Sequence, residues 1–289
     1  MRAAGVVSAR RGNRFEVREA SGTIRLCQLR RRRLGPLVVG DRVVIRTLEA
    51  GEGIIEEVEA RDSVLARPAS AGRSRLIAAN VELILVVIAL RPAISRRTVD
   101  RHLVGSEHLD IPAALVLNKV DLRDDVPAVP DLDPYRRVGY PVYETSALTG
   151  AGLESLARCL EGRIAALVGP SGSGKSSLIR RIVPGADLAV GALSRRGGQG
   201  RHTTTVSTLH ALPEGGFVVD SPGILDFGEW ELPVERIAEG FPEIRALAGR
   251  CRFRDCLHMR EPDCAVAAAP NIDPGRLASY REMVGDRRG

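Results

Sequence analysis

Lysine and aromatic residues are scarce in this chain of 289 residues. Only Lys119 and Lys175 are lysines among its 42 basic residues, and aromatic residues make up 3% of the sequence. The planar fork of arginine cannot replace the compact ammonium group of lysine at every kind of site. We therefore expect both lysines to lie in sites that require that group.

Long apolar runs are also absent. The longest, LILVVIAL at Leu83–Leu90, is well short of the roughly 18 residues of a membrane-spanning helix. The N-terminus, MRAAGVVSARRGNRFE, has no apolar stretch typical of a signal peptide. The sequence therefore predicts a cytoplasmic protein with reduced cysteines and no membrane partner. Its 44% hydrophobic content is enough for a sizeable core.

The net charge of +6 is concentrated at the N-terminal end. Residues 1–35 contain ten arginines against Glu16 and Glu19, a local balance of 10 − 2 = +8. Such a patch is either a solvated face or a nucleic-acid site. Because Phe15 is the only aromatic residue in residues 1–60, arginine contacts with RNA phosphates are favoured over base stacking. The run Arg30–Arg33 fits such a site, or is only a solvated turn.

Residues 5–60 contain short β-type segments separated by glycine-containing turns. They are GVVSA, RFEVRE, TIRLCQL, DRVVIRTLE and GIIEEVE. Five short strands without helices predict a small barrel. The following stretch ARPASAGRSRL, residues 66–76, predicts a linker.

Fully apolar segments then alternate with segments of helical period. The apolar ones are ELILVVIAL, AALVLN, PVYETSA, IAALVG and GFVVDS, and the helical ones include SRRTVDRHLVGSEHL and LESLARCLEG. This alternation predicts an α/β domain with a mostly parallel sheet covered on both faces. Residues 225–289 predict a shorter, mainly helical region, which holds three of the five cysteines.

A phosphate-binding loop is predicted at GPSGSGKSS, Gly169–Ser177, between the strand RIAALVG and the helical SSLIRRIV. Its glycines allow backbone N–H groups to surround phosphates, and the helix N-terminus adds partial positive charge. We expect Lys175 to reach the β- and γ-phosphates and Ser176 to hold Mg²⁺. The loop predicts binding of a nucleoside triphosphate without specifying the base.

The segment NKVD, Asn118–Asp121, indicates guanine. The Asp121 carboxylate can accept hydrogen bonds from N1–H and the exocyclic amine of guanine, which adenine cannot offer. Asn118 can tether neighbouring loops, and the stem of Lys119 can lie over the ring. The segment ETSALTG, Glu144–Gly150, offers the N–H of Ala147 to the guanine O6.

The segment VVDSPG, Val218–Gly223, has the pattern D-x-x-G after an apolar strand. We expect Asp220 in the Mg²⁺ shell and the N–H of Gly223 near the γ-phosphate. Upstream, GGQGRHTTT offers Thr203 or Thr204 as a Mg²⁺ ligand in a switch segment. The alternative is an ordinary polar loop.

These motifs predict the site residues of the chain. The predicted nucleotide-binding residues are Asn118, Lys119, Asp121, Ser146, Ala147, Gly169, Pro170, Ser171, Gly172, Ser173, Gly174, Lys175, Ser176, Ser177, Thr203 and Thr204. The predicted catalytic residues are Lys175, His202, Asp220 and Gly223.

The guanine-reading motif precedes the phosphate loop in this chain, although it follows that loop in the usual order of a GTP-binding domain. Joining the usual ends and cutting the chain elsewhere gives this order, so the sequence predicts a circular permutation. Its consequence is that the chain runs from Gly223 directly into the C-terminal region. The presence or absence of the γ-phosphate at Gly223 can therefore affect the C-terminal region.

The C-terminal stretch CRFRDCLHMREPDC supplies Cys251, Cys256, His258 and Cys264. Three thiolates and one imidazole complete a tetrahedral Zn²⁺ site with no open position, which indicates a structural metal. The alternative is a few buried free cysteines. Cys27 and Cys159 fall in strand and helix patterns and are expected in the core.

The permuted order, the barrel and the Cys/His cluster together resemble the ribosome small-subunit-dependent GTPase A family (RsgA, also called YjeQ). The segments that carry the resemblance are GPSGSGKSSL, GRHTTT, DSPGILDF, NKVDL and DCLHMREPDCAV, and it covers almost the whole chain. The resemblance implies an OB-fold RNA-binding β-barrel, expected at residues 1–65. A circularly permuted GTPase domain at 66–227 and a helical zinc-binding domain at 228–289 follow.

The same resemblance implies the activity and its partners. It implies a monomeric GTPase that binds the small (30S) ribosomal subunit and its rRNA and assists late maturation, with GTP hydrolysis stimulated by the subunit and driving release. The implied cofactors are GTP or GDP, Mg²⁺ and one structural Zn²⁺. Rival interpretations are an RNA-remodelling protein with GTP as a conformational latch, and a small-molecule kinase.

The residue after D-x-x-G is Ile224, which cannot orient water by hydrogen bonding. Intrinsic hydrolysis is therefore expected to be slow. Our hypothesis is that His202 positions the attacking water once a partner orders its loop. A solvated loop histidine is the alternative.

Overall fold

The computed structural model describes residues 1–30, 35–69, 73–185, 207–221 and 232–288. These residues gather into two compact units. The first holds residues 1–83, 153–167 and the described part of 175–224, and the second holds 84–152, 168–174 and the residues from 232 onward. Within the described residues, no helix combines the length and the apolar character needed to cross a membrane.

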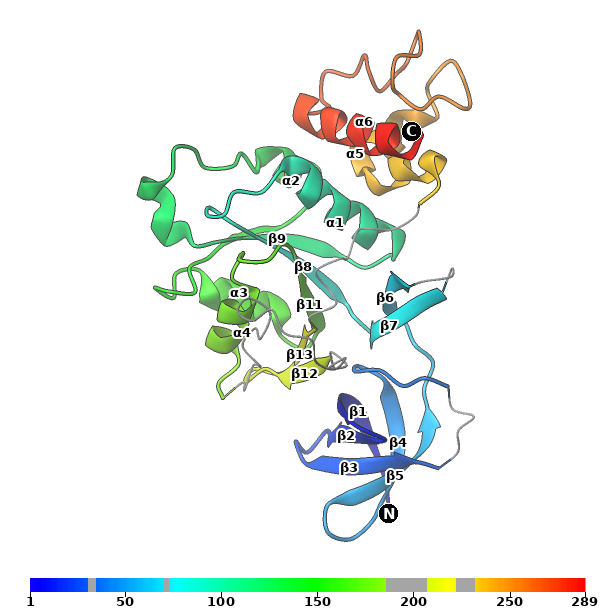
Figure 1. Ribbon diagram of the computed structural model, residues 1–289, viewed down its shortest axis with the longest axis vertical. Coiled ribbons are helices and arrows are strands. Elements are labelled where there is room, and N and C mark those ends of the chain that lie inside the picture. The colour runs from blue at the N-terminus through cyan, green and yellow to red at the C-terminus, as the bar shows by residue number, and fades with distance from the viewer. Residues whose placement is uncertain (31–34, 70–72, 186–206, 222–231, 289) are drawn as a thin grey trace, which may run out of the picture. The chain divides into compact units, whose positions relative to one another are not determined.

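The N-terminal segment forms a five-stranded barrel, shown in blue in Figure 1. Its strands are β1 (Arg2–Arg11), β2 (Arg14–Glu19), β3 (Ile24–Leu29), β4 (Arg42–Thr47) and β5 (Glu52–Val58). The strands pair in the order β1-β2-β3-β5-β4, and an additional β1–β4 pairing closes the barrel. The prediction of a small five-stranded barrel is confirmed.

The barrel is filled by the alternating apolar side chains of its strands. Its buried residues are Val7, Phe15, Val17, Cys27, Leu37, Val43, Ile45 and Ile55. Cys27 is therefore a core residue, as predicted. Cys159, on the helix α3 (Leu153–Leu160), is only half-buried.

Most arginines of the barrel form ion pairs, a feature that the local charge balance does not reveal. The pairs are Arg2 with Glu56 and Glu57, Arg11 with Glu16, Arg14 with Glu52, Arg25 with Glu19, and Arg30 with Glu56. Several partners lie on β5, more than 20 residues away in sequence. Arg10 and Arg18 instead donate to the main-chain carbonyls of Gly12 and Gly22.

The predicted linker at residues 66–76 is wrong for its described part. Residues 66–69 and 73–76 belong to a hairpin of β6 (Val64–Ala69) and β7 (Arg73–Ala79), with a register shift between Leu65 and Ala66. This two-stranded ribbon leaves an edge on each strand, so Pro68 is tolerated where it would break a central strand. Composition alone indicated a linker because both strands are rich in small residues.

The second unit contains a parallel sheet in the order β10-β9-β8. The strands β8 (Leu83–Ala89) and β9 (Ala113–Asn118) are buried along their whole length. In the chain, α1 (Arg96–His108) connects β8 to β9. The Ser95 side chain caps its first turn by accepting a hydrogen bond from the Thr98 N–H. After β9 the chain continues through η2 (Val120–Asp125) and α2 (Asp133–Arg137) into β10 (Val142–Glu144).

In the first unit, β11 (Ile164–Val168) pairs in parallel with β13 (Phe217–Asp220). The phosphate loop follows β11, and α4 (Lys175–Ile182) begins at the end of that loop. The strand β12 (Thr208–Ala211), which the sequence analysis did not anticipate, is antiparallel to β13 and touches β1 through Ala9 and Thr208.

The C-terminal region consists of η4 (Val234–Gly240), α5 (Pro242–Ala248) and α6 (Pro274–Arg288). Helix α6 packs against α1 and η4. Its buried cluster includes Phe241, Ile244, Tyr280 and Val284, and also Val104 of α1. The prediction of a mainly helical region is confirmed.

Candidate nucleotide-binding and metal sites

Asn118 connects the loops of the predicted base site. It is the last residue of β9 and is 1% exposed. Its Nδ2 donates to the carbonyl of Ser173 at 2.9 Å, and its Oδ1 accepts from the Ala147 N–H at 3.2 Å. A side chain with both a donor and an acceptor is required for this role. Asn118 thus joins the end of a buried strand, the phosphate loop and the Ala147 loop.

Lys119 and Asp121 are held beside it. Lys119 lies in the left-handed region with φ of 62°, and its Nζ donates to the carbonyl of Arg91 at 2.7 Å. Such a conformation is costly for a residue with a β-carbon and persists where the surrounding contacts enforce it. Asp121 accepts a hydrogen bond from the Ser146 hydroxyl. The structure therefore brings together Asn118, Lys119, Asp121, Ser146 and Ala147, as the motifs predicted.

The phosphate loop depends on two glycines that leave room for neighbouring polar atoms. A β-carbon at Gly169, where φ is 127°, would lie 2.2 Å from the carbonyl oxygen of Val87. One at Gly174 would lie 2.2 Å from the Nδ2 of Asn118. Any other residue at these positions would push the loop away from β8 and from Asn118. The predicted members between them are Pro170, Ser171, Gly172 and Ser173, of which Ser173 is 1% exposed.

In the other unit, Lys175 and Asp220 interact electrostatically. Burial lowers the pKa of Lys175 to about 8, and the charge of Asp220 opposes that shift. Burial likewise raises the pKa of Asp220 above its ordinary value, against the charges of His210 and Lys175. A buried ammonium and a buried carboxylate are both under-solvated and favour ligands of opposite charge. These two residues suit a phosphate and a divalent cation, respectively. Ser176 and Ser177 follow Lys175 in the first turn of α4.

His210 is a further neighbour of Asp220. It lies on β12, in the segment that pairs with β13, and burial lowers its pKa while Asp220 raises it. The strand alternation of TLHAL could have placed His210 on the same face as Thr208, opposite Asp220. No linear motif indicates this role because the contact depends on the β12–β13 register.

Four predicted site residues lie outside the described residues. They are His202, Thr203, Thr204 and Gly223. Their predicted roles in water positioning, Mg²⁺ binding and γ-phosphate sensing stay predictions.

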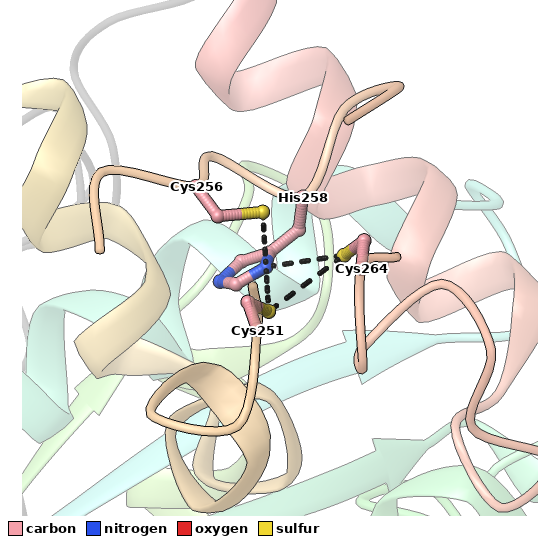
Figure 2. A group of neighbouring side chains, drawn as sticks. All are labelled: Cys251, Cys256, His258 and Cys264. Atoms are coloured by element: carbon pink, nitrogen blue, oxygen red, sulfur yellow. Dashed lines mark hydrogen bonds between the residues drawn. The ribbon is translucent and has the colours of Figure 1, made fainter. Parts of the chain in front are cut away.

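The C-terminal cysteines and histidine converge on one point (Figure 2). The Nδ1 of His258 is 3.5 Å from the sulfurs of Cys251 and Cys256 and 3.4 Å from that of Cys264. The sulfurs of Cys251 and Cys264 are 3.9 Å apart. Tetrahedral zinc, with Zn–S of about 2.3 Å and Zn–N of about 2.0–2.1 Å, places its ligand atoms about 3.5–3.8 Å apart.

The cluster therefore has the spacing of a closed four-ligand zinc site. All four ligand atoms lie within 4.8 Å of one another, and His258 and Cys264 are buried. Since no disulfide joins these cysteines, the sulfurs are available as ligands. The residues fit zinc as predicted from their spacing, and such a site with no open position is structural.

The fold and these sites define a circularly permuted P-loop GTPase: the strand β9, which ends at the NKVD motif, precedes the phosphate loop in the chain, and Asn118 donates a hydrogen bond to that loop. The family model described as RsgA GTPase matches residues 58–230. The chain belongs to the RsgA GTPase family, and it is a GTP-hydrolysing enzyme.

Several known proteins resemble this chain over nearly its whole length. The small ribosomal subunit biogenesis GTPase RsgA of Alcanivorax borkumensis is 45% identical over 292 residues, covering 96% of this chain and 83% of that protein. The protein of the same name from Pseudomonas aeruginosa is 43% identical over 288 residues, with 97% and 84% covered.

Two solved structures share the fold. The crystal structure of YjeQ from Thermotoga maritima has a TM-score of 0.79 and 31% identity, and the comparison covers 100% of this chain and 99% of that one. YloQ, described as a circularly permuted GTPase, has a TM-score of 0.77 and 24% identity, with 100% and 96% covered.

Proposed function

We propose that this chain is a cytoplasmic GTPase that binds the small (30S) ribosomal subunit, assists its late maturation and leaves it after hydrolysing GTP. The observation that carries the proposal is Asn118, which links the base-reading strand, the Ala147 loop and the phosphate loop through three different partners. Relatives named for small ribosomal subunit biogenesis, 45% and 43% identical, supply the subunit as partner.

In this proposal some residues of the nucleotide site select the base, and others bind the phosphates. Asp121, Lys119 and Ala147 select guanine by its hydrogen-bonding edge and its ring face. Lys175 neutralises charge on the phosphates, and the glycines from Gly169 to Gly174 let backbone N–H groups approach them. Ser176 and Asp220 would hold Mg²⁺, which would supply additional positive charge at the phosphates. Catalysis then consists mainly of positioning and electrostatic stabilisation.

The chain is organised, in the same proposal, as a monomer of three functional domains. Residues 1–65 form the RNA-binding barrel, residues 66–227 the permuted GTPase domain and residues 228–289 the zinc-binding domain. Thr203 or Thr204 would be a Mg²⁺ ligand, the N–H of Gly223 would sense the γ-phosphate, and His202 would position the attacking water on the subunit. Replacement of His202 by alanine should abolish subunit stimulation while leaving GTP binding intact. Unchanged stimulated turnover would remove His202 from the mechanism.

The decisive experiment measures phosphate release from GTP, with ATP as control, alone and with purified small subunits. Slow GTP-specific turnover that rises strongly with small subunits supports the proposal. Binding to the subunit is followed in parallel with a non-hydrolysable GTP analogue and with GDP. Tight binding in the triphosphate state alone supports release by hydrolysis, whereas turnover that ignores the subunit would require another partner. Lys175→Ala, which removes the phosphate-binding ammonium, serves as the inactive control.

A further inference from the structure

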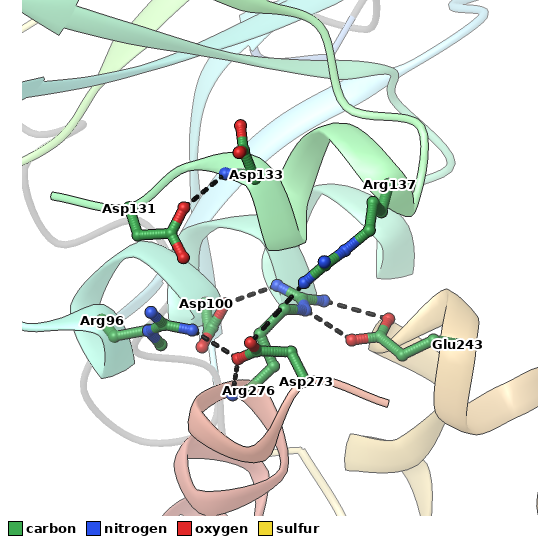
Figure 3. A network of polar contacts seen from close by, with 8 residues as sticks. All are labelled: Arg96, Asp100, Asp131, Asp133, Arg137, Glu243, Asp273 and Arg276. Atoms are coloured by element: carbon green, nitrogen blue, oxygen red, sulfur yellow. Dashed lines mark hydrogen bonds and ion pairs between the residues drawn. The ribbon is translucent and has the colours of Figure 1, made fainter. Parts of the chain in front are cut away.

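Arg276 of helix α6 is a buried charge in the second unit (Figure 3). Its side chain is 1% exposed. Its Nη1 donates to Asp100 of α1 at 2.6 Å, and its Nε and Nη2 donate to the two carboxylate oxygens of Glu243 on α5. Breaking a buried ion pair of this kind leaves an uncompensated charge and is strongly destabilising. Arg276 therefore fixes three helices relative to one another.

Three aromatic rings surround the same guanidinium. Its central carbon lies 4.9 Å from the ring centroid of Tyr135, 5.1 Å from that of Phe241 and 6.0 Å from that of Tyr140. A planar guanidinium can satisfy carboxylates in its plane while its faces attract rings, which the ammonium of lysine cannot do equally well. Phe241 belongs to the C-terminal region, but Tyr135 and Tyr140 do not.

Tyr135 and Tyr140 anchor the segment that joins the two base-reading loops. Residues 122–145 run from Asp121 to Ser146, through η2, α2 and β10. Residues 123–125 and 127–131 are exposed, whereas Leu132, Tyr135 and Tyr140 are buried. The position of residues 122–145 thus depends on a few buried side chains. Two of these are Tyr135 and Tyr140, whose rings lie against Arg276.

Residues 122–145 also contact the base-reading loops directly, at Glu144 and Thr145. Glu144 pairs with Arg136 of α2, at 3.3 Å, and with Arg123 of η2. The next residue, Thr145, donates to the Leu117 carbonyl at 2.8 Å and accepts from the Val120 N–H at 3.1 Å. A displacement of α2 would therefore reach the backbone on either side of Asn118.

The middle of α6, at Tyr280 and Arg281, contacts the loop of the Cys/His cluster. The hydroxyl of Tyr280 donates to the Leu257 carbonyl, and Nε of Arg281 donates to the His258 carbonyl, both at 2.9 Å. The rings of Tyr280 and Phe241 meet edge to face with centroids 5.5 Å apart. Helix α6 therefore connects the loop of the Cys/His cluster with the ion pairs and rings around Arg276.

We propose that Arg276 is a positioning residue for guanine recognition: through Tyr135 and Tyr140 it holds the segment that sets the geometry of Asp121 and Ala147. The C-terminal metal-binding region then supports base selection as well as its own fold. This inference rests on the proposed guanine site at Asn118–Asp121. It adds a contribution from a region that contains no residue of that site.

The test compares dissociation constants for GDP and inosine diphosphate, which lacks the exocyclic amine read by Asp121. Arg276→Lys keeps the charge but loses the fork and the planar stacking. We expect the preference for GDP over inosine diphosphate to fall by about 3- to 30-fold, the range seen for mutations along coupled networks. Turnover at saturating GTP should change by less than about twofold, because the phosphate-binding residues are untouched. A purely structural role would lower the active fraction without changing this ratio.

Arg97→Gln is the matched control, because Arg97 of α1 also pairs with the C-terminal region, through Asp286 of α6, and this ion pair involves neither Tyr135 nor Tyr140. The preference of this control for GDP over inosine diphosphate should equal that of the wild type. An equal fall of this preference in the control and in Arg276→Lys would overturn the specific role of Arg276. If Arg276→Lys does not fold, the neutral triple variant Arg276→Met, Asp100→Asn, Glu243→Gln replaces it, since it leaves no unpaired buried charge.

An unchanged ratio in a folded, metal-containing variant would contradict the inference. Failure of the proposed guanine site itself is distinguishable, because the wild-type protein would then show no preference for GDP over ADP.

Discussion

At the scale of single residues, the nucleotide site is held by side chains that have more than one partner. Asn118 joins the phosphate loop and the Ala147 loop to the end of β9, and Asp121 is oriented by the Ser146 hydroxyl. Each of the two lysines of the chain has a polar partner within its own unit: Lys119 donates to the Arg91 carbonyl, and Lys175 interacts with the charge of Asp220. That both lysines occupy positions where arginine cannot substitute stays a prediction.

Asp121→Asn should change the preferred base. A carboxylate accepts from both N1–H and the exocyclic amine of guanine, whereas an amide offers one acceptor and one donor, which matches the N1–H and the C2 carbonyl of xanthine. We expect the GDP affinity to fall by on the order of 100-fold, since a buried donor loses its partner, and xanthosine diphosphate to become the tighter ligand. Competition binding with the two nucleotides measures this. Retained GDP preference would contradict the role of Asp121.

Nucleotide affinity should weaken as pH rises through about 8. The pKa of Lys175 is lowered to about 8 by burial, so the free protein loses this proton above that pH, whereas the lysine bound to phosphates keeps it. Binding above pH 8 therefore requires proton uptake, and the affinity should fall by up to about tenfold per pH unit. Calorimetry in buffers of different ionisation enthalpy detects the uptake. Lys175→Ala, which has no such proton, should show a flat profile over this range.

At the scale of elements, the C-terminal region combines two devices that compensate for its small core. Its own buried cluster is completed by Val104 from α1, and its loop is held by the Cys/His cluster. Helix α6 links the two, because Tyr280 and Arg281 reach the loop while Arg276 reaches α1 and α5. Metal binding and helix packing should therefore be cooperative.

Removal of one metal ligand should unfold this region selectively. Structural zinc in small domains contributes on the order of 10 kcal/mol of apparent folding free energy. Cys256→Ser should reduce bound zinc from one equivalent towards none and increase hydrogen exchange in α5 and α6, while the barrel strands stay protected. Cys159→Ser, a half-buried thiol on α3, is the control and should keep its metal. Full zinc occupancy in Cys256→Ser would exclude this cluster as the site.

At the scale of the whole molecule, charge is distributed less simply than the sequence suggests. The ten arginines of residues 1–35 gave a local balance of +8, but acidic residues of β5 neutralise several of them within the barrel. Exposed ion pairs contribute little to stability, so their main effect here is on the electrostatic field. If the barrel binds RNA as proposed, fewer arginines should contact phosphates than the arginine count implies.

The salt dependence of binding to small subunits tests this distribution. Each lost phosphate contact lowers the slope of log affinity against log salt by about 1. If Arg10 and Arg18 bind phosphates, the double variant Arg10→Gln, Arg18→Gln should lower the slope by about 2. The ion-paired control Arg11→Gln should change it less. Equal slopes in all three proteins would place RNA contacts outside these arginines.

The sequence by itself predicted several features that contiguous residues encode: the five barrel strands, the phosphate loop between β11 and α4, the permuted order and the cluster of three cysteines and a histidine. Each depends on local periodicity or on fixed spacing, so neighbours in the chain suffice to predict it. It misjudged residues 66–76, because a hairpin of small residues has the composition of a linker.

Only the tertiary structure decided which distant side chains meet. The approach of His210 to Asp220 follows from the register of β12 on β13, and the neutralisation of Arg2 and Arg14 follows from the position of β5. The node at Arg276 joins residues 100, 135, 243 and 276. Such contacts depend on how helices and strands pack, and no linear pattern carries that information.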